Sequence, residues 1–261
     1  MRKPQTISNR FPALRVILAL MLREMSTRYG QSAGGYLWAV VEPLGAIFIL
    51  AAGYGMILSA PPLGVSHILF LASGFLPFSL FQSMQLTVAR SLIFSRPLLN
   101  YPVVGWCHAV VARGLLNGLT GLLIAAIVLG VVLGISTARA TPDAQLILAA
   151  LGLSLVLGAG VGVLNAALIG LWPVWEQIWS VATRPLFFVS AVFFLPETLP
   201  NWAQDILWFN PLIHVVGLMR DGLYGFYSPA ITPLYACAAG VIPLAVGLLV
   251  LTRYHHVILS R

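Results

Sequence analysis

The sequence QLILAALGLSLVLGAGVGVLNAALIGL occupies residues 145–171 and contains no Asp, Glu, Lys or Arg. The hydrocarbon core of a bilayer is about 30 Å thick and a helix rises about 1.5 Å per residue, so about 20 apolar residues cross it. A helix also satisfies its own backbone hydrogen bonds, which lipid cannot do. This run therefore predicts a transmembrane helix.

The rest of the chain shares this apolar character. Of its 261 residues, 59% are hydrophobic and 8% are charged, and the mean hydropathy is +0.94. Soluble domains carry roughly 25% charged residues. A soluble protein of this size could not bury so much apolar surface, so lipid must be its solvent.

Further apolar segments flank the run, and we expect an all-α integral membrane protein with about six transmembrane helices in one domain, residues 1–261. The predicted spans are residues 34–58, 66–88, 104–134, 145–171, 175–195 and 230–251. In the fifth span, the uncharged run 185–195 is too short to cross hydrocarbon alone. The span must begin near Trp175, which places Arg184 inside it.

Three segments outside the spans carry their own patterns. Residues 10–30 show apolar side chains at helical spacing, which predicts an amphipathic helix in the cytoplasmic membrane interface. Residues 89–103 form a basic loop with one short helical turn. In residues 196–229, prolines break the chain into short helical pieces. Such pieces can re-enter the membrane only where protein or water satisfies their backbone, so we expect a gate on the outer face.

The charge distribution predicts the orientation of the chain. There are 14 Lys and Arg against 7 Asp and Glu, and six of the fourteen cations lie in the first 28 residues. The N-terminus, residues 89–103 and the C-terminus are rich in cations, whereas the alternate loops hold most acids. The positive-inside rule and an even number of spans place both termini in the cytoplasm. No basic groove-binding motif supports nucleic-acid binding.

Motifs for catalysis are absent from the sequence. There is no Gly-x-x-x-x-Gly-Lys-Ser/Thr, and the only lysine is Lys3, so the chain cannot hydrolyse ATP by a P-loop mechanism. Neither the histidines nor the cysteines, Cys107 and Cys237, are spaced as a metal set. Paired carboxylates within the spans are also missing, which weakens a proton-coupled carrier. We therefore expect no catalytic residues, no metal and no cofactor bound by this chain.

Three ionisable residues, Glu42, Arg113 and Arg184, fall within or near the predicted hydrocarbon. Such residues are costly in lipid and usually line a hydrated path or pair with one another, although Arg113 could snorkel to the interface from its span end. Aromatic faces pack on the C–H faces of sugar rings and could line a conduit, with core packing as the alternative. Trp172, Trp175 and Trp179 fit an interfacial belt. The candidates for a translocation path are Tyr36, Trp38, Glu42, Trp175, Arg184, Phe187 and Phe188.

Small residues recur at helix-packing spacing, as in Gly158 and Gly162, where they allow close backbone approach. The stretch Gly-Ala-Gly-Val-Gly at 158–162 is not a phosphate loop, because it lies inside an apolar run without a following Lys-Ser/Thr.

Three motifs resemble the permeases of capsule-polysaccharide ABC exporters, within the ABC-2 superfamily. They are REMSTRYGQSAGGYLWAVVEP (residues 23–43), SRPLLNYPVV (residues 95–104) and FNPLIHVVGLMRDG (residues 209–222). The motifs follow one another in order and span most of the chain. After Val104 the family pattern would place another charged or polar cluster, where this sequence has Gly105-Trp106-Cys107-His108.

The resemblance implies an architecture and a set of partners. Two copies would form a channel in the inner membrane of a Gram-negative bacterium, and each would dock a separate ATPase subunit that binds the ATP and Mg. The cargo would be a lipid-linked acidic polysaccharide, which periplasmic and outer-membrane export proteins would carry onward. The 89–103 loop would couple to the ATPase through Arg90, Arg96, Leu98, Leu99, Asn100 and Tyr101. The periplasmic gate would include Trp202, Trp208, Asn210, Pro211 and Arg220.

Other functions remain open at this point. An ABC-2 permease for O-antigen, teichoic acid or a small molecule would share these features. A membrane-bound glycolipid enzyme would need clustered polar catalytic residues at one interface, and none is found. A self-sufficient channel or secondary carrier would need no ATPase and usually carries intramembrane acids.

Overall fold

The computed structural model describes residues 12–29, 34–99, 103–136 and 142–260, and within them every regular element is a helix. The all-α prediction is therefore confirmed. In chain order the elements are α1 (Pro12–Tyr29), α2 (Gly35–Ile57), α3 (His67–Ala89), α4 (Ser91–Leu99), α5 (Trp106–Ile135), α6 (Ala144–Leu171), α7 (Val174–Ala182), α8 (Leu186–Val189), the 3-10 turn η1 (Pro196–Thr198), α9 (Asn201–Trp208), α10 (Pro211–Tyr224) and α11 (Pro233–Ser260).

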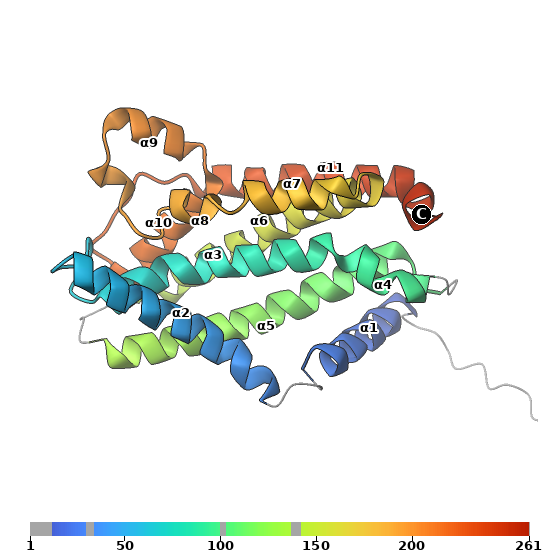
Figure 1. The fold of residues 1–261 in the computed structure, drawn as a ribbon, viewed down its shortest axis with the longest axis horizontal. Coiled ribbons are helices and arrows are strands. Elements are labelled where there is room, and N and C mark those ends of the chain that lie inside the picture. Colours follow the sequence, from blue (N-terminus) through green and yellow to red (C-terminus); the bar gives the residue numbers. More distant parts are fainter. Residues whose placement is uncertain (1–11, 30–33, 100–102, 137–141, 261) are drawn as a thin grey trace, which may run out of the picture.

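Five helices in the described part of the chain, α2, α3, α5, α6 and α11, are long and apolar enough to cross a bilayer. Helices α3, α5, α6 and α11 extend along the length of the molecule, and α2 crosses obliquely over the left-hand part of the bundle (Figure 1). The chain makes a sixth passage through α7, α8 and the irregular residues after them. The expectation of about six passages is thus met by five continuous helices and one interrupted one.

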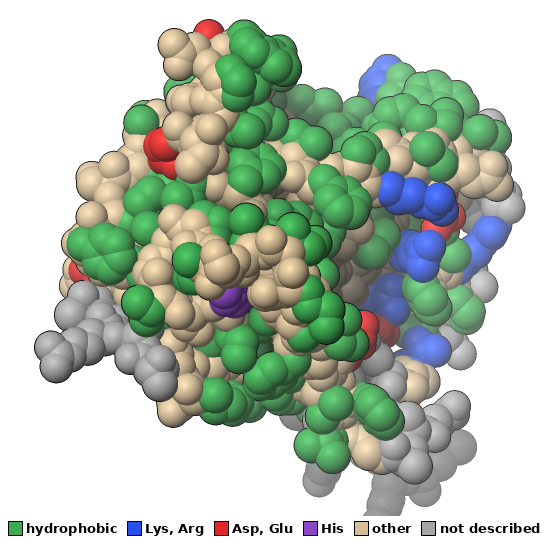
Figure 2. All heavy atoms as spheres, turned by 60° about the vertical axis from the view of Figure 1, so that its left-hand side comes forward, with side chains coloured by type: hydrophobic (Ala, Val, Ile, Leu, Met, Phe, Trp, Pro, Cys, Tyr) green, Lys and Arg blue, Asp and Glu red, His purple; other side chains and the backbone are tan. Residues whose placement is uncertain are grey.

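The two ends of the bundle differ in charge. Helix α1, helix α4 and the C-terminal end of α11 lie at one end, and α8, α9 and α10 lie toward the other (Figure 1). Figure 2 shows Lys and Arg side chains gathered away from the end turned forward, where acidic side chains are seen. The positive-inside rule assigns the cation-rich end to the cytoplasm. The opposite end, called here the outer end, faces the other side of the membrane.

Helix α6 lies at the centre of the bundle and packs against α3 and α11 through glycine. A Cβ on Gly160 would overlap the carbonyl oxygen of Gly240 in α11, and one on Gly158 would lie 2.7 Å from Cβ of Met84 in α3. In lipid, helices associate through such close packing, because transfer of apolar groups from water no longer drives them together. The prediction that Gly158 and Gly162 mediate helix packing is confirmed.

The fifth passage differs from the predicted continuous span 175–195, because Thr183-Arg184-Pro185 separates α7 from α8. Pro185 has no N–H to donate to Val181, and its ring would clash with that carbonyl in a continuous helix. Beyond α8 the chain is irregular, and Ala191 has a φ of 57°. Non-helical backbone at membrane depth requires partners from the surrounding protein.

Two other segments are more regular than the sequence suggested. The 89–103 loop contains a nine-residue helix, α4, which follows α3 after a turn at Arg90. Within residues 196–229, α10 is a buried fourteen-residue helix. Asn210 caps its first turn, Pro211 occupies the first helical position, and Gly225 ends it with a φ of 63°.

Candidate functional site

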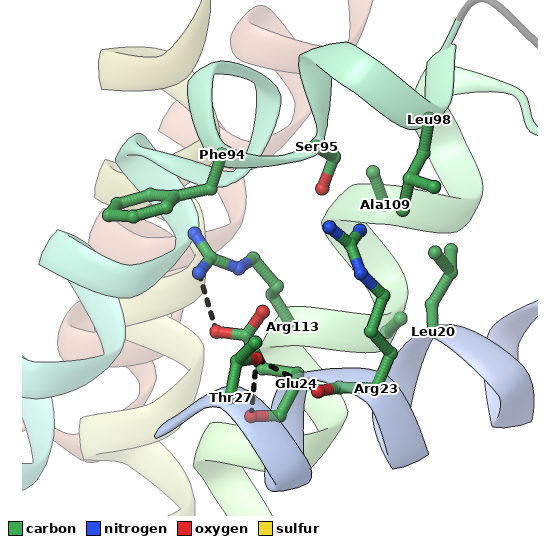
Figure 3. Close-up of a pocket in the computed structure, with 10 residues that line it drawn as sticks. Leu20, Arg23, Glu24, Thr27, Phe94, Ser95, Leu98, Ala109 and Arg113 are labelled. Carbon is green, nitrogen blue, oxygen red and sulfur yellow. Dashed lines mark hydrogen bonds and ion pairs between the residues drawn. The ribbon is translucent and has the colours of Figure 1, made fainter. Parts of the chain in front are cut away.

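A cavity of about 380 Å³ lies at the cytoplasmic end, where α1, α4 and α5 meet. Its walls carry Arg23, Glu24 and Thr27 of α1, Phe94 and Ser95 of α4, and Arg113 of α5, as Figure 3 shows. The polar side of α1 therefore faces protein, whereas its apolar side chains Leu14, Leu18, Leu22 and Met25 are exposed. An exposed apolar face on a helix at the cation-rich end agrees with its expected place in the membrane interface.

Arg113 connects the three walls of this cavity. Its Nη2 donates to Oε1 of Glu24, its Nη1 donates to the carbonyl oxygen of Arg90 at 3.3 Å, and its guanidinium lies 4.4 Å from the ring centroid of Phe94. Arg113 is only 8% exposed, so it does not snorkel freely into water. It pairs with an acid on α1, and not with either of the other ionisable residues predicted to lie in the spans.

A second ion pair connects the same corner to the fifth passage. Arg90, at the turn between α3 and α4, donates from Nε to Oε1 of Glu176 in α7 at 2.8 Å. Both side chains are substantially exposed, so this pair contributes at most about 1 kcal/mol. Its importance is geometric, because it joins the start of α4 to the first turn of α7.

Indole groups hold α7 against the bundle. Trp175 Nε1 donates to Oδ1 of Asn165 in α6, and Trp179 Nε1 donates to Oε1 of Gln85 in α3, each at 2.9 Å. Asn165 and Gln85 are buried, so each bond satisfies an amide oxygen that lipid could not. Of the three tryptophans expected in an interfacial belt, only Trp172 is strongly exposed.

The predicted coupling residues fall on or beside α4. Arg90 is the turn residue described above, Arg96 is exposed, and Leu98 lines the cavity. Leu99 packs on a buried apolar cluster shared by α3, α5, α6 and α11. Asn100 and Tyr101 lie outside the described residues.

The candidates for a translocation path have different surroundings, and only Glu42 and Phe187 line one groove together. A groove of about 500 Å³ between α2, α3 and α5 is lined by Glu42, Gln82 and Phe187 among others. Trp38, Arg184 and Phe188 are exposed. Trp175 is turned inward to Asn165 as described, and the side chain of Tyr36 is not among those the structure describes.

The predicted gate residues have different surroundings. Trp202 on α9 is 69% exposed. Trp208 stacks on Tyr235 at a centroid distance of 5.1 Å. Asn210 caps α10 and also donates to the carbonyl oxygen of Val189. Pro211 begins α10.

Arg220, predicted as a gate residue in a long outer loop, is completely buried. Its guanidinium donates to the carbonyl oxygens of Val192 at 3.1 Å and Phe194 at 3.0 Å, and its Nε donates to Oγ of Ser73 at 3.3 Å. Tyr54 of α2 donates to the carbonyl oxygen between them, at Phe193. These bonds satisfy the irregular backbone after α8. Burial lowers the pKa of Arg220 to about 10, which leaves it charged at neutral pH.

Sequence reasoning missed the partners of these arginines. The sequence did contain a signal for the partner of Arg113. Glu24 is the only acid in α1 and belongs to the 23–43 motif. No sequence feature indicated Ser73 or Tyr54, since both lie far along the chain from Arg220. The pairs form only through the packing of the helices.

Comparison with known proteins agrees with this architecture. The family described as ABC-2 type transporter matches residues 15–224, which include all three motifs. The polysialic acid transport protein KpsM of Escherichia coli is 29% identical over 88% of this chain and 90% of that protein. The capsule polysaccharide export inner-membrane protein BexB of Haemophilus influenzae is 30% identical over 81% of this chain and 80% of BexB. The corresponding protein CtrC of Neisseria meningitidis serogroup B is 26% identical over 92% of this chain and 91% of CtrC. The chain therefore belongs to the ABC-2 type transporter family, as a membrane-spanning transport subunit and not an enzyme.

Proposed function

We propose that this chain is the permease subunit of an ATP-driven exporter that moves lipid-linked, acidic capsular polysaccharide across the bacterial inner membrane. It works as a homodimer with two separate ATPase subunits, which bind the ATP and Mg. The observation that carries the proposal is the similarity, over most of the chain, to proteins named for capsule polysaccharide export and polysialic acid transport. Periplasmic and outer-membrane export proteins receive the polymer.

The cytoplasmic corner supports a route for force from the ATPase. Helix α4 presents the exposed side chains Ile93, Phe94 and Arg96 at the end of the bundle. A movement of α4 reaches α1 and α5 through Arg113 and reaches α7 through Arg90. ATP supplies the energy for transport, and it reaches the permease only if the ATPase in its ATP-bound and ATP-free states differs in affinity for two arrangements of this corner.

The groove between α2, α3 and α5 supports a polar path beside this corner. Its wall combines the carboxylate of Glu42 and the amide of Gln82 with the ring of Phe187. Polar residues inside a membrane span usually mark such paths. Aromatic rings there can support sugar rings without holding them tightly.

The test is to copurify the chain with its cognate ATPase and to measure ATP hydrolysis and polymer uptake in inverted membrane vesicles. Arg96→Ala should lower polymer uptake per ATP hydrolysed, whereas Arg253→Ala, which removes another exposed cation from α11, should not. Equal behaviour of the two variants would reject a coupling role for α4. Stimulation of hydrolysis by O-antigen or a small molecule, and not by acidic capsule polymer, would assign the permease another cargo.

A further inference from the structure

We propose that Glu42 of one copy pairs with Arg184 of a second copy, so that two such ion pairs hold the homodimer together inside the membrane. This inference rests on the proposed homodimer and adds the residues that join its halves. It starts from two charged side chains, Glu42 and Arg184, for which the described part of a single chain supplies no ion-pair partner.

Both residues are exposed at membrane depth. Glu42 is the only charged residue of α2, two turns after its start, and Arg184 lies in the break between α7 and α8. Within the part of the chain that the structure describes, neither side chain has an ion-pair or hydrogen-bond partner. A charge facing lipid is strongly unfavourable, so each requires an opposite charge or water.

The surfaces around the two charges are also uncovered. In α2, only 11% of the residues in the span are buried. In α7 and α8 no residue is buried, and Val174, Ile178 and Val181 are exposed along one side of α7. Apolar surfaces that each carry one isolated charge of opposite sign are complementary to each other and not to lipid.

The two surfaces belong to the same face of the bundle. In Figure 1, α2 and the α7–α8 pair lie on either side of α3, toward the viewer. Phe187, three residues after Arg184, lines the same groove as Glu42. A second copy that covers this face therefore meets both charges.

Membrane symmetry selects the pairing. A closed, symmetric dimer of two copies with the same orientation in one membrane has its two-fold axis along the membrane normal. Such an axis in front of α3 places α2 of each copy opposite α7 and α8 of the other. Rotation about the normal keeps every residue at its own depth, so paired residues must lie at the same level. Figure 1 shows the first part of α2 and the α7–α8 break at a similar level near the middle of the bundle.

A second copy also balances these two charges. Each chain supplies the carboxylate of Glu42 and the guanidinium of Arg184, so the dimer forms two such pairs and leaves neither residue over. A different partner would have to supply a cation to α2 and an anion to α7 at the same time. In this arrangement Arg184 binds a carboxylate of the second copy. It does not contact the cargo in a translocation path.

The test uses two differently tagged chains in a Cys107→Ser, Cys237→Ser background, one with Glu42→Cys and the other with Arg184→Cys. They are coexpressed in membranes without the ATPase and treated with a short bifunctional thiol crosslinker, because the long Glu and Arg side chains of an ion pair can hold their Cα atoms beyond the reach of a direct disulfide. We expect a crosslinked heterodimer as the main product. The matched control joins Glu42→Cys with Leu249→Cys, an exposed position on α11, and should crosslink at least tenfold less. Absence of the heterodimer, or equal crosslinking in the control, would overturn the pairing.

Charge exchange gives an independent readout if the cysteine chains fold poorly. Glu42→Arg and Arg184→Glu alone should each lower the dimer fraction in native mass spectrometry at least fivefold, and the double exchange should restore it. If the single changes leave the dimer fraction unaltered, the pairing is wrong. Because neither experiment involves ATPase or polymer, their failure is distinct from failure of the transport function, and a dimer that moves no polymer would reject that function alone.

Discussion

The contact between Arg113 and Glu24 allows a quantitative test of the cytoplasmic corner. We expect Arg113→Met and Glu24→Met each to loosen α1 from α5, because each change leaves the other charge in a largely buried place. Removing one partner of a fully buried ion pair costs about 3–5 kcal/mol. A fully exposed pair contributes about 0–1 kcal/mol. With side-chain exposures of 9% and 23%, this pair lies between the limits, at about 1–3 kcal/mol.

The assay is native-state hydrogen exchange of the α1 amides in lipid nanodiscs. A change of about 1–3 kcal/mol in local opening corresponds to exchange that is roughly 5- to 150-fold faster. In the double variant Arg113→Met, Glu24→Met, the α1 amides should exchange more slowly than the two single effects would predict if they were additive. The reason is that the double variant leaves neither Arg113 nor Glu24 as an unpaired charge. Arg90→Met with Glu176→Met is the matched control, since that pair is exposed and each change should cost less than about 1 kcal/mol. Additive effects at Arg113 and Glu24, or unaltered exchange, would refute the reasoning.

Three further predictions concern other parts of the fold. Gly160→Ala should lower the melting temperature of the protein in detergent by several degrees, because the added Cβ overlaps the carbonyl of Gly240, whereas Gly152→Ala has open space and should not. Arg220→Lys should destabilise the outer end by about 2–5 kcal/mol, because one ammonium cannot donate to the carbonyls of Val192 and Phe194 and also to Ser73. A cysteine placed in the irregular segment after α8 should then react faster with a thiol reagent. Burial lowers the pKa of His214, whose Nδ1 accepts from the Thr232 amide, so its contribution to stability is full above about pH 6.5 and is lost as the pH falls through the lower folded pKa. Trp fluorescence between pH 5 and 8 should show this loss, and His214→Gln should remove the pH dependence without altering the signal at pH 8.

Local sequence was sufficient for much of this fold. The continuous spans follow from long apolar runs whose length matches the bilayer, and the orientation follows from the position of the cations. The bounds of α10 are also encoded locally, because Asn210 and Pro211 mark its start and Gly225 marks its end. The coupling residues around α4 came from family motifs, and their roles stay predictions.

The partners of the charged residues were decided only by tertiary structure. Arg113 could have snorkelled, lined a path or paired with another intramembrane charge, and it contacts Glu24 because α1 crosses α5 at that point. Arg220 reads as a loop cation in the sequence, yet the packing of α10 against α3 buries it and directs it to the irregular backbone of the fifth passage. The physical reason is range. A span depends on about 20 consecutive apolar residues and a cap on a single turn, so both are local in the sequence. Ion pairs and contacts to irregular backbone depend on how separate helices meet.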